Sequence, residues 1–205
     1  YPMAGYISKA GHNVTVYNRT KSKAEKWIKE YKGKVAETPE EAAKDSDFIF
    51  TCVGNDDDVK EVATGKRGIF NSIKKGSIYI DNTTASATVA RELYKNAKAH
   101  GFGFLDAPVS GGTNGAENAE LAIMVGGDKK VFSKNLNILK KLGNPVLVGK
   151  NSAGQTAKLA NQIIVGITIG SVSEAIKLSQ KNNVNPINIL KALKGGWADS
   201  KVLQT

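Results

Sequence analysis

Short apolar runs alternate with longer amphipathic segments up to about residue 149, and this alternation constrains the fold most strongly. Residues 47–53 form the clearest run, because they are apolar almost throughout, like a strand covered on both faces of a parallel sheet. The pattern predicts an α/β fold with a Rossmann-type doubly wound parallel sheet. Strands are predicted at residues 13–17, 34–36, 47–53, 77–81, 103–107, 121–125 and 145–148. Helices are predicted at residues 2–10, 21–31, 57–63, 87–100 and 132–142, with another beginning at Thr38-Pro39.

The alternation stops at about Gly149, and only helical patterns follow it. Residues 149–177 read as one long helix with apolar residues on nearly every side, which predicts a buried helix. A shorter helix is expected from Asn185-Pro186 to Gly195-Gly196. We therefore predict a Rossmann domain over residues 1–150 and the beginning of an all-helical second domain over residues 151–205.

The two ends of the sequence do not match complete domains of these kinds. A Rossmann unit begins with a strand and a glycine-rich turn before its first helix. Here a helical pattern begins at Pro2, and neither the strand nor the glycine loop precedes it. The helical part ends at Thr205, soon after it has begun. We expect a fragment that lacks the first strand and glycine loop and is truncated within the helical domain.

Composition excludes several classes of protein. The single cysteine, Cys52, rules out an internal disulfide and fits a reducing compartment. We find no signal-peptide pattern and no uninterrupted apolar run of about 18 residues, so no membrane span is expected. A cytoplasmic location is predicted, with an organelle matrix as the alternative.

The formal net charge of +10 favours anionic ligands such as carboxylates, phosphates or nucleic acid. The lysines are spread over the predicted helices without interleaved aromatic residues, however, which is more typical of solvated faces than of a nucleic-acid groove. No His, Cys, Asp or Glu cluster has the spacing of metal ligands, so no metal site is expected.

Lys158 is an unusual residue near the beginning of the long predicted helix. It shares one helical face with Asn161 and Gln162, which follow three and four positions later. A lysine there faces the positive end of the helix dipole, and apolar neighbours would desolvate it; both effects lower its pKa. Lys158 is therefore a candidate proton donor near neutral pH. The alternative is a lysine whose stem lies on apolar surface while its ammonium group reaches water.

Three segments at predicted strand ends are candidates for the ligand crevice of a Rossmann fold. Tyr17-Asn18-Arg19-Thr20 follows the strand at 13–17 and contains no acid; Arg19 could pair with a 2′-phosphate, or it could be a solvated turn residue. Val53-Gly54-Asn55 and Asp81-Asn82-Thr83-Thr84 carry small and hydroxyl side chains that allow close approach of a ligand. Ordinary turn chemistry explains these two equally well.

A fourth segment, D-A-P-V-S-G-G at residues 106–112, also follows a predicted strand. Ser110, Gly111 and Gly112 could form a nest of backbone N–H groups that holds a carboxylate. The alternative is a flexible loop.

Taken together, Asn18-Arg19-Thr20, Asp81-Asn82-Thr83-Thr84, D-A-P-V-S-G-G and G-Q-T-A-K-L-A-N-Q (residues 154–162) resemble the β-hydroxyacid dehydrogenase family. This family includes 3-hydroxyisobutyrate dehydrogenase, tartronate semialdehyde reductase and glyoxylate/succinic semialdehyde reductases. The resemblance covers the whole chain. It implies an oxidoreductase that uses NADP, or alternatively NAD, to interconvert a small β-hydroxy acid and its semialdehyde.

The resemblance also implies roles for individual residues. Lys158 would be the catalytic acid/base, and Ser110, Gly111, Gly112, Asn161 and Gln162 would bind the carboxylate substrate, with Asn161 favoured over Gln162 as the orienting amide. The long apolar helix and the helical second domain suggest subunit packing, so a homo-oligomer, dimer or tetramer, is expected. The residues expected at the cofactor are Asn18, Arg19, Thr20, Val53, Gly54, Asn55, Asp58, Thr83 and Thr84.

Three other readings remain open at this point. The chain could be a non-catalytic NADP-binding module of the same family, although such a relative would be expected to have lost Lys158. It could be an imine reductase on the same fold, against which the lysine again argues. The positive charge leaves nucleic-acid binding as a third reading.

Overall fold

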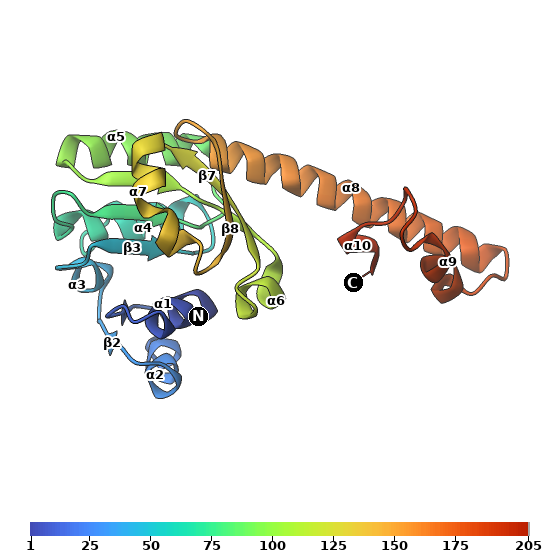
Figure 1. Ribbon diagram of the computed structural model, residues 1–205, viewed down its shortest axis with the longest axis horizontal. Coiled ribbons are helices and arrows are strands. Elements are labelled where there is room, and N and C mark those ends of the chain that lie inside the picture. Colours follow the sequence, from blue (N-terminus) through green and yellow to red (C-terminus); the bar gives the residue numbers. More distant parts are fainter. Residues whose placement is uncertain (205) are drawn as a thin grey trace. The chain divides into compact units, whose positions relative to one another are not determined.

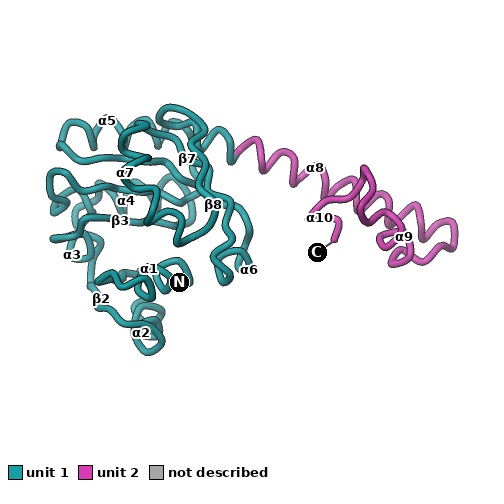
Figure 2. The backbone as a smooth tube through the Cα atoms, in the orientation of Figure 1, with its two compact units in different colours: residues 1–158 teal, residues 159–205 magenta. Residues whose placement is uncertain are grey.

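The computed structural model describes residues 1–204 and divides into two compact units, residues 1–158 and 159–205. Figure 2 shows the two units in teal and magenta. The strands all belong to the first unit, and the second is helical among its described residues.

A six-stranded sheet forms the centre of unit 1, in the order β3-β4-β5-β7-β6, with β8 also paired to β7 (Figure 1). The pairs β3–β4, β4–β5 and β7–β8 are parallel. Two further strands, β1 (Thr15–Val16) and β2 (Lys34–Val35), form a separate parallel pair. The strands of the larger sheet are β3 (Phe48–Thr51), β4 (Ile78–Asp81), β5 (Gly103–Asp106), β6 (Val109–Ser110), β7 (Leu121–Gly127) and β8 (Gly143–Gly149).

The predicted α/β fold with a Rossmann-type sheet is confirmed, and the sheet is mixed in direction at β7. This strand runs antiparallel to both β5 and β6. Parallel neighbours need a crossover of about a dozen residues or more. Only the short helix α6 (Gly112–Glu117) and its flanking turns separate β6 from β7, so the chain returns antiparallel. The sequence analysis predicted neither β6 nor α6.

Helices cover both faces of the sheet because its strands alternate apolar side chains between the two faces. On β4, Tyr79 packs in one core cluster with Val59 and Leu93, whereas Ile80 packs in the other with Leu139. The helices of unit 1 are α1 (Pro2–Lys9), α2 (Lys21–Glu30), α3 (Pro39–Ala43), α4 (Asp56–Thr64), α5 (Ala87–His100) and α7 (Lys129–Leu139), with a 3₁₀ turn at Ile69–Asn71.

Helix starts follow the polar capping residues of the sequence. Asn55 accepts a hydrogen bond from the Asp58 N–H at the start of α4, and Ser86 accepts one from the Val89 N–H at the start of α5. Helix α5 ends at Gly101, whose φ of 79° is a left-handed conformation that suits glycine. These local signals explain why the predicted range 87–100 matches α5 at both ends.

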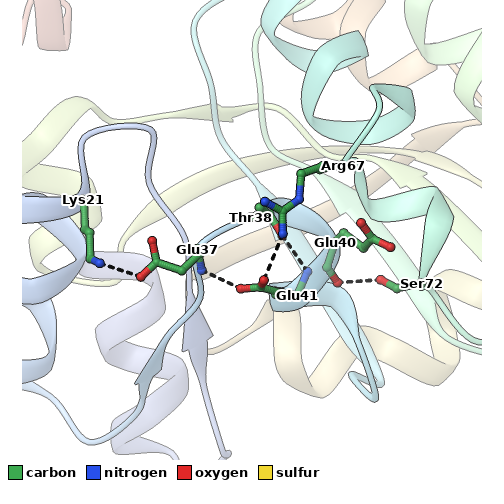
Figure 3. Close-up of polar contacts among 7 residues, drawn as sticks. All are labelled: Lys21, Glu37, Thr38, Glu40, Glu41, Arg67 and Ser72. Atoms are coloured by element: carbon green, nitrogen blue, oxygen red, sulfur yellow. Dashed lines mark hydrogen bonds and ion pairs between the residues drawn. The ribbon is translucent and has the colours of Figure 1, made fainter.

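A polar network fixes the segment between β2 and α3 (Figure 3). Lys21 pairs with Glu37 at 2.6 Å, and Arg67 pairs with Glu41 at 3.1 Å. The Glu37 N–H also donates to Glu41 Oε2 at 2.9 Å, while Thr38 caps α3. Exposed ion pairs contribute at most about 1 kcal/mol each. The network therefore sets local geometry more than it stabilises the fold.

Helix α8 (Ala153–Lys181) begins in unit 1 and continues into unit 2, where α9 (Pro186–Leu193) and α10 (Lys201–Gln204) follow. Asn185 caps α9, as its position before Pro186 predicted. The predicted burial of the long helix is wrong over much of its length. Ile163, Ile164 and Ile167 are more than 60% exposed, since no described residue covers these side chains.

By length and composition alone, α8 is apolar enough to cross a bilayer. This differs from the expectation of no such segment, because the isoleucine-rich middle of the helix outweighs its polar residues. A single helix of this kind is weak evidence for a membrane span.

The first turn of α8 packs against the sheet of unit 1, where a Cβ on Gly154 would lie 2.3 Å from the Met124 carbonyl oxygen.

Candidate active site

The first turn of α8 is held by a buried carboxylate at the end of β5. Asp106 accepts hydrogen bonds from the Ser152 N–H at 2.7 Å and the Gln155 N–H at 3.0 Å. Burial raises the pKa of Asp106 to about 6, although these backbone donors act in the opposite direction. Gly126 permits the close packing, because a Cβ there would lie 2.6 Å from Asp106 Oδ1. The beginning of α8 is therefore fixed to β5 and β7.

Lys158 lies one turn beyond this anchor and is 7% exposed. Its Nζ makes no hydrogen bond or ion pair with any residue that the structure describes. Desolvation lowers its pKa, which agrees with the expectation from the sequence. No carboxylate among the described residues pairs with the amine, so Lys158 releases its proton more readily than a solvated lysine.

The loop of Ser110, Gly111 and Gly112 lies beside the same strand that supports α8. Ser110 pairs with Ala122 of β7, while the first turn of α8 contacts Met124 further along β7. Gly111 and Gly112 have φ values of 139° and 60°, which glycine adopts without strain. Strand β7 thus links the predicted carboxylate loop to the helix that carries Lys158.

The end of β1 meets the start of α4 through Arg19. Its guanidinium pairs with Asp58 Oδ1 at 3.2 Å, while the Arg19 side chain remains 85% exposed. The Asn18 side chain accepts a hydrogen bond from the Thr20 N–H at 2.9 Å and so shapes the turn. Arg19 is therefore held at the strand end with its remaining N–H groups open to a ligand.

The ends of β3 and β4 are joined by a buried hydroxyl. Thr83 is 1% exposed, and its Oγ1 accepts a hydrogen bond from the Val53 N–H at 3.1 Å. Its neighbour Thr84 is exposed. At Gly54 a Cβ would lie 2.6 Å from Asp58 Oδ2, so the backbone there has no room for a side chain. Thr83 therefore ties the loop after β4 to the end of β3, with Thr84 exposed beside it.

Two buried side-chain oxygens beside this loop lack hydrogen-bond partners among the described residues. They are Asp81 Oδ2 and Asn82 Oδ1, at the end of β4. Burial raises the pKa of Asp81, against the effect of its hydrogen bond from Thr83. An exposed guanidinium after β1 and small residues at the ends of β3 and β4 are chemically compatible with binding of a dinucleotide.

Two family models match the chain in succession. The NAD-binding domain of 6-phosphogluconate dehydrogenase matches residues 1–154. The NAD-binding domain of NADP-dependent 3-hydroxyisobutyrate dehydrogenase matches residues 152–205. The chain belongs to the β-hydroxyacid dehydrogenase family. Its members are NAD(P)-dependent oxidoreductases, so the resemblance stated from the sequence is confirmed.

Individual members of the β-hydroxyacid dehydrogenase family match almost the whole chain. An uncharacterised oxidoreductase of Shewanella frigidimarina is 41% identical over 98% of this chain and 69% of its own length. The 2-hydroxy-3-oxopropionate reductase of Escherichia coli is 37% identical over 99% of this chain and 69% of its own. A solved structure of Mycobacterium tuberculosis 3-hydroxyisobutyrate dehydrogenase with L-serine has a TM-score of 0.88 at 28% identity, covering 100% of this chain and 69% of that one.

The two amide residues that were predicted to contact the substrate, Asn161 and Gln162, lie on α8 in unit 2. Asn161 is half-buried and donates from Nδ2 to Gln162 Oε1 at 2.9 Å, whereas Gln162 is exposed. Within residues 1–204, no group of three or more His, Cys, Asp or Glu side chains could hold a metal ion.

Asp106 and Gln155 were not identified as functional residues from the sequence. Asp106 had a usable signal, because it is a carboxylate near the end of a predicted strand of otherwise uncharged residues and precedes the glycine loop. Gln155 had none beyond its position three residues before Lys158, since a glutamine within a helix follows no diagnostic pattern.

Proposed function

We propose that this chain is an NADP-dependent oxidoreductase that interconverts a small β-hydroxy acid and its semialdehyde, with Lys158 as general acid/base. The observation that carries the proposal is the buried Lys158 amine, of lowered pKa and without a partner among the described residues. Several relatives point to the same substrate class, since one is named a 2-hydroxy-3-oxopropionate reductase and others are named probable 3-hydroxyisobutyrate dehydrogenases or dehydrogenase-like proteins.

Arg19 is proposed to select NADP over NAD. The turn of residues 17–20 carries no acid that could accept a hydrogen bond from a ribose 2′-hydroxyl. A guanidinium instead pairs with a 2′-phosphate through two N–H groups, and Asp58 occupies only part of its donor set. Asn18 and Thr20 shape the turn, and Val53, Gly54, Asn55, Thr83 and Thr84 are proposed to form the rest of the crevice.

The substrate carboxylate is proposed to bind at Ser110, Gly111 and Gly112. The hydroxyl and the backbone N–H groups of such a loop are suitable donors to a carboxylate. Asn161, with Gln162 as the second choice, would orient the carbonyl or hydroxyl group of the substrate. These contacts would fix the reacting carbon, which matters because small misplacements are costly in rate.

When bound, the nicotinamide supplies the hydride chemistry of the reaction. During reduction, Lys158 would donate a proton to the oxygen that becomes an alkoxide, and during oxidation it would take the hydroxyl proton. A lowered pKa makes the Lys158 ammonium a better proton donor than a solvated lysine. Burial of the amine also strengthens its electrostatic effect on the developing negative charge.

The direct test follows nicotinamide absorbance during incubation with glyoxylate, succinic semialdehyde, tartronate semialdehyde and methylmalonate semialdehyde. Turnover that is faster with NADPH than with NADH would support the proposal and rank the substrates. Measurable NADPH binding without turnover of any semialdehyde would contradict it and favour the non-catalytic reading.

A homo-oligomer of two or four subunits and a cytoplasmic location are part of the proposal. Light scattering of the purified enzyme measures the first, and a monomeric mass would contradict it. Fractionation of the cells that produce the protein measures the second.

A further inference from the structure

Gln155 is completely buried in the first turn of α8 and makes two hydrogen bonds to the loop after β4. Its Oε1 accepts from the Ala85 N–H at 2.9 Å. Its Nε2 donates to the Thr83 carbonyl oxygen at 2.7 Å. Both partners are backbone groups, so the side chain constrains the path of the loop itself.

The same loop borders the proposed cofactor crevice. Thr83 joins the end of β3 through the Val53 N–H, and Thr84 beside it is exposed. Gln155 therefore connects the ends of β3 and β4 to α8 through one side chain. Its backbone N–H adds a third tie, to Asp106 at the end of β5.

Lys158 follows Gln155 by three residues on the same helix, within one turn. The second turn of α8 cannot move relative to the loop of residues 83–85 without stretching the Gln155 bonds. The distance between the Lys158 amine and a ligand at that loop is therefore set partly through Gln155.

We propose that Gln155 is a positioning residue, which fixes the loop of Thr83 and Ala85 to the turn of α8 that carries Lys158. This inference rests on the proposed function of Lys158. Gln155 touches neither the substrate nor the reacting atoms in this role. It acts by holding the proton donor and the cofactor loop at a constant separation.

Only a side chain with both a donor and an acceptor can make this link. In Gln155→Met both side-chain hydrogen bonds are lost, while the volume of the side chain stays similar. In Gln155→Glu, an ionised carboxylate can still accept from the Ala85 N–H but is repelled by the Thr83 carbonyl oxygen. A protonated glutamic acid donates through its O–H and restores the pair, and burial raises the pKa of such an acid.

The experiment compares wild type, Gln155→Met, Gln155→Glu and the control Gln180→Glu, which lies on the same helix at an exposed position. The first readout is hydrogen exchange of the Ala85 amide in the enzyme without ligands. The second is kcat and the substrate KM as functions of pH. Three other titratable groups, Asp106, Asp81 and Lys158, lie near residue 155 in every variant. To separate their effect on kcat from that of residue 155, the pH profile of each variant is divided by the wild-type profile.

The proposal predicts that Ala85 exchanges at least about tenfold faster in Gln155→Met, because its hydrogen-bond acceptor is gone. Gln155→Glu is expected to lose about tenfold or more in kcat at alkaline pH, with little change in KM, and to recover on acidification. Gln180→Glu should follow wild type throughout. A melting curve for each variant confirms that it is folded.

Unchanged Ala85 exchange in Gln155→Met would overturn the link itself. A second outcome is faster Ala85 exchange in Gln155→Met together with a wild-type kcat for Gln155→Glu at all pH values. That outcome would overturn the role of Gln155 in positioning Lys158. Equal turnover by wild type and Lys158→Met would instead count against the proposed function. The exchange measurement does not depend on turnover, so the two failures are distinguishable.

Discussion

The guanidinium of Arg19 pairs with the Asp58 carboxylate at 3.2 Å across two elements that are far apart in the sequence. Arg19 follows β1, and Asp58 lies in the first turn of α4 after β3. The pair is exposed, so its contribution to stability is at most about 1 kcal/mol. Its significance is geometric, because it holds a cation after β1, where the proposed NADP site would place the adenosine ribose.

Replacing Arg19 tests cofactor selection. Arg19→Ala should raise the KM for NADPH by about tenfold to a hundredfold, since a charge-assisted hydrogen bond contributes about 1.5–3 kcal/mol. The KM for NADH should change little, because NADH has no 2′-phosphate. Arg67→Ala is a suitable control, as it removes an exposed arginine that is paired with Glu41 elsewhere. Equal losses with both cofactors would remove Arg19 from selection.

Asp106 predicts a pH dependence of stability. Its pKa is raised from 3.8 to about 6 in the folded state, so between these values the folded protein binds a proton that the unfolded chain does not. The free energy of unfolding should therefore fall as pH rises through this window, by up to roughly 3 kcal/mol from this group. The contribution of Asp106 to the free energy of unfolding is fully present below about pH 4 and is lost above about pH 6.

The measurement is denaturant unfolding of wild type and Asp106→Asn across pH 4 to pH 7, taken as a difference between the two proteins. Asparagine does not titrate, so the variant should lack this part of the dependence. Asp106→Asn should also cost about 1–3 kcal/mol at pH 4, because an amide cannot accept both the Ser152 and Gln155 N–H bonds equally well. A difference that is independent of pH would refute the assignment.

The packing of α8 on the sheet predicts opposite effects at two glycines of the same helix. Gly154→Ala would place a methyl group 2.3 Å from the Met124 carbonyl oxygen, so it should destabilise by about 1–3 kcal/mol or more. Gly166→Ala meets no atom within 4 Å and should stabilise by roughly 0.5–1 kcal/mol through helix propensity. Thermal unfolding of both variants checks the pair. Similar shifts at both sites would show that α8 is not seated as described.

Local sequence signals predicted most of the fold of unit 1. The strand at 47–53 and the helix at 87–100 were found because apolar periodicity and the caps Ser86 and Gly101 act within a few residues. The antiparallel course of β7 was not predicted, because pairing direction depends on the length of the β6–β7 connection. The glycine-rich stretch of residues 111–115 gives no periodic signal for the short helix α6.

The candidate site also has features that the local sequence predicts and features that depend on contacts between distant residues. Lys158 was singled out because a cation is unusual at a helix start. Arg19 was singled out because the turn after the strand at 13–17 has no acid and an arginine can pair with a 2′-phosphate. The buried state of Thr83 and the bonds of Gln155 could not be predicted, because they depend on contacts between residues about 70 positions apart, such as Gln155 with Thr83 and Ala85. The exposure of Ile163 and Ile167 was missed because periodicity shows where apolar residues lie, not whether another element covers them.

The most direct test of the central claim is single-turnover reduction of a semialdehyde by Lys158→Met with bound NADPH. Loss of a general acid lowers the rate of the chemical step by about 10²–10⁴-fold, and NADPH affinity should stay within about twofold of wild type. Lys177→Met, an exposed lysine on the same helix, serves as the matched control and should react like wild type. A chemical step in Lys158→Met as fast as in wild type would contradict the account.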